Sequence, residues 1–170
     1  MIGKEMKCNG DDRMSFHTNY EKWVYYTKKE NCPVCNKEPA PPDDVDIIEF
    51  PTSWLCAHPR VCLKGTCYLL LKPHAVELFD LDDDTLFSFM KEAQISAKVL
   101  KEVTQAIKIN YEIHGNTFPH LHMHLFPRYL DDPFPGQSID FNRTDPPVYS
   151  TSEFEEFIDN MRKKLAELSR

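Results

Sequence analysis

Long apolar runs are missing from this sequence of 170 residues: none approaches the roughly 20 residues that a membrane-spanning helix needs. The first residues, MIGKEMKCNGDDRMSFH, lack the apolar core of a secretory signal, so we expect a cytoplasmic protein. No internal repeat is visible. With 41% apolar and 28% charged residues, the chain has the composition of one globular domain that contains its own core.

An excess of positive charge is also missing, because the net charge is −7. Binding to nucleic acid depends mostly on phosphate contacts, so this balance argues against a general nucleic-acid binder and against a role in repairing nucleic-acid ends. We expect neither a nucleic-acid nor a membrane partner. A small anionic substrate, held by a local group of hydrogen-bond donors, remains compatible with the charge.

Hydrophobic periodicity predicts an α+β fold with an antiparallel sheet, because strands and helices alternate in the order β-β-β-α-β-β-α. A further, shorter helix is predicted before the first strand. The clearest helix begins at Asp80 or Asp82, and the last is capped by Ser152. We expect a flexible tail at 1–15, a main folded domain at 16–130, and an irregular segment with a final helix at 131–170 that packs on the same domain. The expected helices cover 16–29, 80–105 and 151–170, and the expected strands 46–50, 53–58, 65–74, 106–113 and 119–126.

Three of the seven histidines occupy alternate positions of one predicted strand: His120, His122 and His124. Side chains of a strand alternate between faces, so the three share one face while the apolar residues between them form the core face. Neighbouring positions on one face lie roughly 6.6 Å apart, and the outer pair roughly 13 Å apart. One metal ion therefore cannot bind all three, and we expect them to have different roles.

Small polar residues stand directly before this strand. The backbone N–H of Gly115 and the side chains of Asn116 and Thr117 could hold an anionic oxygen. Arg128 follows the strand.

Three motifs together resemble those of the histidine-triad (HIT) family of nucleotide hydrolases and transferases. His-Leu-His-Met-His-Leu-Phe resembles the family signature, in which histidines alternate with apolar residues. GNTFPH is similar to the family's Gly-Gln-Ser/Thr-x-x-His approach, and GTCYLLLKPH is similar to its upstream strand, with Lys72 and Pro73 in swapped order. The likeness covers roughly residues 30–130 and is nearest to the zinc-containing branch that is similar to diadenosine polyphosphate hydrolases.

The resemblance implies a covalent two-step reaction at the α-phosphate of a nucleotide, and it also implies a homodimer. His122 would be the nucleophile, since a neutral imidazole has a ring nitrogen free to attack. His124 would be the second catalytic histidine and would help to hold the phosphate oxygens. The substrate-binding residues would be Asn110, Gly115, Asn116 and Thr117, with Asn110 at a spacing slightly different from the family's.

Cys32-Pro-Val-Cys35 has the spacing of a zinc knuckle, but no second Cys-x-x-Cys follows it. In the similar triad proteins and uridylyltransferases, the upstream histidine and the first triad histidine complete the site. By that resemblance, the ligands of a structural zinc would be Cys32, Cys35, His74 and His120. The alternative is a free, redox-active cysteine pair.

Three functions remain open. The first is a hydrolase of nucleoside phosphoramidates or dinucleoside polyphosphates, and the second is a nucleotidyltransferase or phosphorylase. The similar uridylyltransferases carry glutamine where this sequence has His124, which favours hydrolysis. The third is a non-catalytic, zinc-stiffened nucleotide-binding module, against which the intact His122 argues. His17, His58 and His114 have no motif around them and are interpreted as surface or capping residues. His114 is close enough to the triad to contact substrate, but the structural interpretation is favoured.

Overall fold

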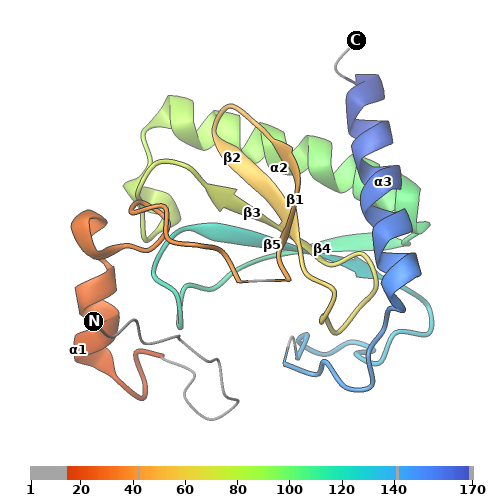
Figure 1. The fold of residues 1–170 in the computed structure, drawn as a ribbon, viewed down its shortest axis with the longest axis horizontal. Helices are drawn as coiled ribbons and strands as arrows, with labels where there is room; N and C mark the ends of the chain where they lie inside the picture. Colours follow the sequence, from red (N-terminus) through yellow and green to blue (C-terminus); the bar gives the residue numbers. More distant parts are fainter. Residues whose placement is uncertain (1–14, 42, 141, 169–170) are drawn as a thin grey trace.

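The computed structural model describes residues 15–41, 43–140 and 142–168, and a five-stranded antiparallel sheet forms the centre of this part (Figure 1). The strand order is β1-β2-β3-β5-β4, which confirms the predicted α+β class. None of the described helices is long and apolar enough to cross a membrane. The strands are β1 (Val45–Glu49), β2 (Ser53–Ala57), β3 (Cys67–Leu71), β4 (Lys108–Ile113) and β5 (His122–Arg128), and the α-helices are α1 (Tyr20–Tyr26), α2 (Asp83–Thr104) and α3 (Thr151–Leu168).

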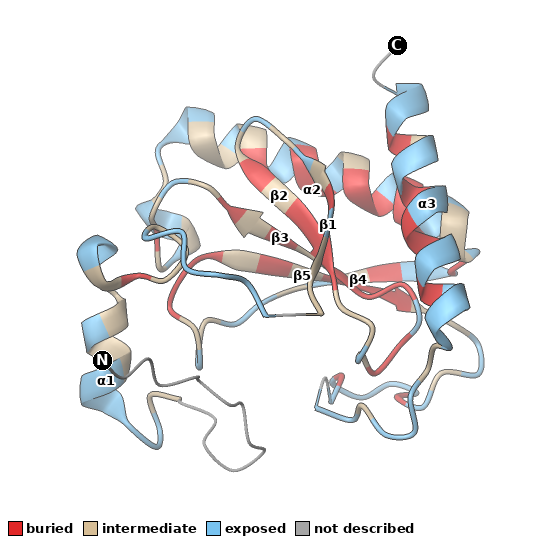
Figure 2. Ribbon diagram, viewed as in Figure 1, coloured by how far each residue is buried: buried red, intermediate tan, exposed pale blue. Residues whose placement is uncertain are grey.

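The two faces of the sheet differ because side chains alternate along each strand. On β3, the side chain of Leu69 is fully buried and pairs with Met123 of β5, which belongs to the same core. The next pair, Tyr68 and His124, points to the opposite face. Helices α2 and α3 cover the apolar face, as the buried residues of Figure 2 show. The triad histidines His122 and His124 therefore lie on the face that these helices leave open.

Helix α2 begins where the sequence predicts a cap. The side chain of Asp82 accepts a hydrogen bond from the backbone N–H of Thr85 at 2.8 Å, so Asp82 and not Asp80 is the N-cap. A buried carboxylate attaches the helix to the sheet: Glu92 accepts from the N–H of Thr52 at 2.8 Å and from the hydroxyl of Ser53 at 2.6 Å. These bonds satisfy a charge that would be costly to bury alone.

Helix α3 buries the predicted face, but the predicted cap is wrong. Ser152 lies inside the helix, and Ser150 caps it by accepting a hydrogen bond from the N–H of Glu153 while its own N–H donates to the Glu153 carboxylate. This reciprocal pair is a capping box, which the Ser-x-x-Glu spacing would have predicted. The buried side chains are Phe154, Phe157, Ile158, Met161 and Leu165.

The first helix is shorter than predicted. Asn19 caps α1 by accepting from the N–H of Lys22, so Phe16 stands before the helix and not on its face. No residue of α1 is buried, and the helix lies at the opposite end of the molecule from α3 (Figure 1). The expected flexible tail falls on residues 1–14, which lie outside the described part of the chain, with Ser15 as its only described residue.

Candidate active site

Two of the three alternating histidines project from β5 onto the open face. The ring centroids of His122 and His124 are 5.0 Å apart. The strand begins at His122, so His120 precedes it, whereas the alternation places all three residues in the strand. His120 is fully buried, while His122 and His124 are partly exposed. The triad is therefore divided into one interior and two accessible imidazoles.

The accessible histidine His122 has one ring nitrogen occupied. Its Nδ1 lies 2.7 Å from the backbone carbonyl oxygen of His120. A carbonyl oxygen only accepts, so Nδ1 carries the hydrogen and Nε2 of the neutral ring retains a lone pair. The backbone thereby fixes which nitrogen of His122 can act as a nucleophile.

Burial keeps both accessible histidines neutral. The low-polarity surroundings lower the pKa of His122 below its usual value, because burial penalises the charged ring. The same cause, with smaller contributions from His122 and His114, lowers the pKa of His124 to about 3. At neutral pH both rings are uncharged, which is the protonation state that nucleophilic attack by an imidazole requires.

The turn before β5 is held in place by the N-terminal segment. Gly115 has a φ of +79°, which suits a residue without a Cβ, and its carbonyl accepts a hydrogen bond from Nε1 of Trp23 at 2.9 Å. The carbonyl of Asn116 accepts from the N–H of Phe16 at 3.0 Å. In a trans peptide the N–H points opposite to the C=O, so the N–H groups of Asn116 and Thr117 point away from that segment.

The cysteine pair meets two histidines from distant parts of the chain. The Sγ of Cys32 lies 3.2 Å from Nδ1 of His120, and the Sγ of Cys35 lies 3.3 Å from Nδ1 of His74. All four donor atoms lie within 4.8 Å of one another. The structure thus brings together the four side chains that the sequence predicts as metal ligands.

The geometry of this group fits one tetrahedral metal ion. Zinc bonds of about 2.3 Å to sulfur and 2.0–2.1 Å to nitrogen place neighbouring ligand atoms roughly 3.3–3.8 Å apart. Both histidines also direct Nε2 at a carbonyl oxygen at 2.7 Å, that of Thr27 for His74 and that of Leu71 for His120. These bonds fix the tautomer that leaves Nδ1 as a ligand, a common arrangement around protein-bound zinc.

The thiol of Cys35 would be protonated without a cation. Burial and the neighbouring Cys32 raise the pKa of Cys35 to about 11. A bound metal ion reverses this preference, because a coordinating thiol loses its proton. The other three described cysteines, Cys56, Cys62 and Cys67, are buried and form no disulfide.

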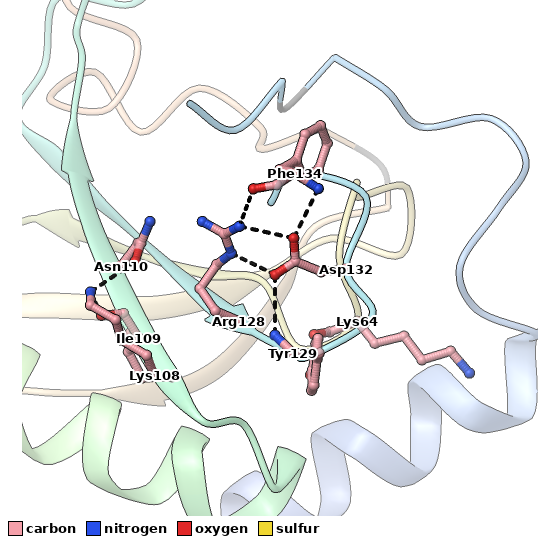
Figure 3. A network of polar contacts seen from close by, with 8 residues as sticks. All are labelled: Lys64, Lys108, Ile109, Asn110, Arg128, Tyr129, Asp132 and Phe134. Atoms are coloured by element: carbon pink, nitrogen blue, oxygen red, sulfur yellow. Dashed lines mark hydrogen bonds and ion pairs between the residues drawn. The ribbon is translucent and has the colours of Figure 1, made fainter. Parts of the chain in front are cut away.

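Strand β4 presents different residues to the triad than the sequence predicts. Asn110 pairs with Phe126, two positions beyond His124, and accepts from Lys108 Nζ at 2.9 Å (Figure 3). The residue directly opposite His124 is Glu112. Asn110 as a substrate ligand therefore remains a prediction, at a position further from His122 than the motif implies.

His114 also lies next to the triad, at a position where the sequence allowed a substrate contact but favoured a structural role. The ring centroids of His114 and His124 are 5.9 Å apart, and Nε2 of His114 lies 3.0 Å from a carboxylate oxygen of Glu112. Alternation along β4, which places Asn110, Glu112 and His114 on one face, was the signal that could have found it.

A tyrosine with a carboxylate partner lines the other side of the triad. Tyr68 of β3 pairs with His124, at 6.1 Å between ring centroids, and its hydroxyl donates to Asp44 at 2.9 Å. Burial raises the pKa of both Tyr68 and Asp44. Nothing in the motif pointed to these two residues, because they meet the histidines only through the pairing of the strands.

A surface cavity of about 700 Å³ lies elsewhere, between the connection from β2 to β3, the segment after β5 and α3. Its lining includes Asp132, whose carboxylate accepts two hydrogen bonds from the guanidinium of Arg128, at 2.7 and 2.8 Å (Figure 3). The Arg128 side chain is therefore engaged by this loop, and the candidate active site is defined by the histidines and not by cavity volume.

Comparison with known proteins agrees with this geometry. The HIT domain model matches residues 42–131, more than half of the chain, so the protein belongs to the HIT domain family. No curated protein sequence matches the chain significantly.

Solved structures share the fold. A histidine triad protein from Bradyrhizobium japonicum is 28% identical, with a TM-score of 0.64 over 72% of this chain and 91% of that chain. A Zn-bound histidine triad family protein from Mycobacterium smegmatis is 22% identical, with a TM-score of 0.60 over 84% and 98%. The diadenosine triphosphate hydrolase of Plasmodium falciparum is 16% identical, with a TM-score of 0.56 over 72% and 76%.

Proposed function

We propose that this protein hydrolyses nucleoside phosphoramidates or dinucleoside polyphosphates at the α-phosphate, through a covalent nucleotidyl-histidine at His122. The observation that carries the proposal is the contact between Nδ1 of His122 and the carbonyl of His120, because it leaves the lone pair on Nε2 for attack. Membership of the HIT family and the naming of one structural neighbour as a diadenosine triphosphate hydrolase also support it.

In the first step, Nε2 of His122 bonds to the α-phosphorus and the leaving group departs. The N–H groups of Asn116 and Thr117, together with Gly115, would hold the phosphate oxygens, and neutral His124 would add a further contact. Water then attacks phosphorus and returns the electron pair to Nε2. Such reactions depend mainly on positioning and charge stabilisation, which suits a preformed turn beside the nucleophile.

We further propose that the group of Cys32, Cys35, His74 and His120 binds one structural zinc ion. The metal would join the N-terminal segment, which carries both cysteines, to β3 and β5. Support comes from the four converging donor atoms and from the two carbonyls that fix the histidine tautomers. One similar structure is described as Zn-bound. Elemental analysis of purified protein should find about one zinc per chain, since a closed four-ligand site holds a single ion.

A cytoplasmic homodimer, with residues 16–130 as the catalytic domain and 131–170 packed on it, completes the proposal. Strand β4 is an edge of the sheet, and the side chains of Tyr111 and Ile113 on it are exposed. An exposed edge with apolar side chains is suited to pairing with another chain. Sedimentation equilibrium, or light scattering coupled to gel filtration, should give twice the chain mass.

A substrate panel tests the proposed activity. Adenosine and guanosine phosphoramidates, dinucleoside tri- and tetraphosphates and nucleotide sugars are compared by kcat/KM, with and without inorganic phosphate or a sugar phosphate as acceptor. Hydrolysis without an acceptor supports the hydrolase, and acceptor-dependent turnover would replace it with a nucleotidyltransferase. Binding without any turnover would instead leave a nucleotide-binding module.

A further inference from the structure

A fourth histidine stands beside the triad on the neighbouring strand. His114 directly follows β4, its ring centroid lies 5.9 Å from that of His124, and its Nε2 contacts the Glu112 carboxylate at 3.0 Å. About a third of the His114 side chain is exposed, so the ring borders the open face where a substrate would enter. None of the HIT motifs found in the sequence includes this position, and the sequence alone favoured a structural role over a substrate contact.

The proposed reaction needs a proton that the triad is poorly placed to supply. His122 uses Nδ1 to donate to a backbone carbonyl and Nε2 to attack phosphorus. His124 is packed between the rings of His122 and Phe126, with centroid distances of 5.0 and 5.6 Å, and burial disfavours its charged form. A basic leaving group must nevertheless take up a proton as its bond to phosphorus breaks.

We propose that His114 is the general acid and base of this active site and that Glu112 is its positioning residue. This inference rests on the proposed function. A histidine that is oriented by a carboxylate at one ring nitrogen and that borders the face where substrate enters has the usual arrangement of a catalytic proton carrier. Here Glu112 contacts Nε2, which directs Nδ1 of His114 away from the carboxylate and makes it the proton-carrying atom.

The proton moves from His114 to the leaving group in the first step and returns from water in the second. Nε2 of His122 forms a bond to the α-phosphorus, the bond from phosphorus to the leaving group breaks, and the leaving group takes both the electron pair and the proton from Nδ1 of His114. In the second step, Nδ1 of the now neutral His114 accepts a proton from the attacking water while the phosphorus–nitrogen bond electrons return to His122. The enzyme is regenerated without any further reactant.

The role of His114 selects a substrate class. An amine leaving group is strongly basic and cannot depart as an anion, whereas a nitrophenolate or a polyphosphate departs with little help. A site with a dedicated acid therefore suits nucleoside phosphoramidates, with an amine as the leaving group, better than dinucleoside polyphosphates. The carboxylate of Glu112 also favours phosphoramidates, because it would repel the additional negative charge of a polyphosphate tail placed beside it.

Two substrates that share one nucleoside monophosphate test this proposal: an alkylamine phosphoramidate and a p-nitrophenyl ester. His114→Gln should lower kcat/KM for the phosphoramidate by about 100-fold or more, within the usual range for general acid catalysis, and by less than about 3-fold for the ester. Glu112→Gln should give a smaller loss with the same dependence on the leaving group. His17→Gln, which changes an exposed histidine with no role in the site, should leave both substrates unaffected.

Equal losses for the two substrates, or no loss for either, would overturn the proposal. The underlying function is tested separately by mass spectrometry of the wild-type protein quenched during turnover of the ester. If an adduct forms on His122 but the two substrates lose activity equally, only the role of His114 is wrong. If no adduct forms, the nucleotidyl-histidine mechanism itself is wrong. If His114→Gln does not fold, the leaving-group dependence of Glu112→Gln decides the question in the same way.

Discussion

His120 and His122 are two residues apart and carry the same side chain, yet the structure places them in different surroundings. His120 is fully buried, with Nδ1 at the thiol of Cys32 and Nε2 at the carbonyl of Leu71. His122 is partly exposed, and its Nδ1 donates to the backbone carbonyl of His120. Each ring donates one N–H to a backbone carbonyl, but through a different nitrogen. Nε2 is the donor in His120, which leaves the lone pair on Nδ1, and Nδ1 is the donor in His122, which leaves the lone pair on Nε2.

This difference shows how one sequence motif can serve two purposes. In a neutral imidazole, the nitrogen that donates to a carbonyl determines that the other nitrogen has the lone pair. The lone pair of His120 faces the protein interior and the cysteines, whereas the lone pair of His122 is available on the open face of the sheet. We therefore propose that His120 binds the metal and that His122 is the nucleophile. Two substitutions test this division and two more test the surrounding structure, ordered by expected effect.

His122→Ala should have the largest effect and should be confined to catalysis. Loss of the nucleophile is expected to lower kcat by roughly 10⁴- to 10⁶-fold, as for other covalent enzymes, while the metal content and the melting temperature stay close to wild type. Steady-state kinetics, elemental analysis and calorimetry on the same preparation measure all three. Near-normal turnover in this variant would show that another residue is the nucleophile.

Cys32→Ala should show the opposite pattern, with stability and metal affected first. The apparent binding free energy of structural zinc is about 10–16 kcal/mol in small zinc-dependent peptides, so losing one of four ligands should cost several kcal/mol of unfolding free energy. Denaturant unfolding and zinc analysis are the measurements, and Cys62→Ala, at a buried thiol outside the group, is the matched control. Unchanged unfolding after chelation of the wild-type protein would contradict the structural role.

Asp132→Asn should affect stability alone, because Asp132 belongs neither to the proposed metal site nor to the catalytic histidines. Hydrogen bonds from Arg128 lower the pKa of Asp132 to about 2, and only 4% of its side chain is exposed. The carboxylate therefore stabilises the fold above its unfolded pKa of about 3.9, by about 1–3 kcal/mol, and this contribution disappears as the pH falls towards 2. Urea unfolding from pH 7 to pH 2.5 should show wild type and variant converging, and a constant difference would be the contrary result.

Trp23→Phe should have the smallest effect. It tests whether the N-terminal segment positions the turn independently of its proposed role in metal binding. The ring is retained, but the hydrogen bond from Nε1 to the Gly115 carbonyl is lost, at a cost of about 1 kcal/mol. If the segment positions the turn for phosphate binding, KM should rise about 2- to 10-fold at constant zinc content, with kcat little changed. Tyr25→Phe on the same helix is the control. Equal KM values in the two variants would show that Trp23 does not position the turn.

Local patterns predicted most of the fold because they depend on neighbours in sequence. The apolar face of α3 and the cap of α2 at Asp82 follow from helical spacing and from the acidic first turn. The cap of α3 was misassigned because two hydroxyl residues, Ser150 and Ser152, stand close together and only the pairing of Ser150 with Glu153 distinguishes them. The start of β5 was misplaced because the backbone N–H of His120 donates to the carbonyl of Phe118, within the preceding turn, and not to a neighbouring strand.

The candidate site was predictable only in part. The turn at Gly115 and the histidine motif are contiguous, so the sequence displays them together. Glu112 and His114 lie beside His124 because of the register between β4 and β5, and Tyr68 lies there because of the register between β3 and β5. Register depends on the packing of the whole sheet, so no local spacing reveals these neighbours.

The sequence by itself determined the family motifs, the α+β class and the residue types available for chemistry and for a metal. The tertiary structure decided which ring nitrogen of each histidine is occupied, which thiol meets which imidazole, and that a carboxylate and a fourth histidine flank the triad. The physical reason is that side-chain alternation is a property of one strand, whereas hydrogen-bond partners of a ring nitrogen come from strands and segments that only folding brings together.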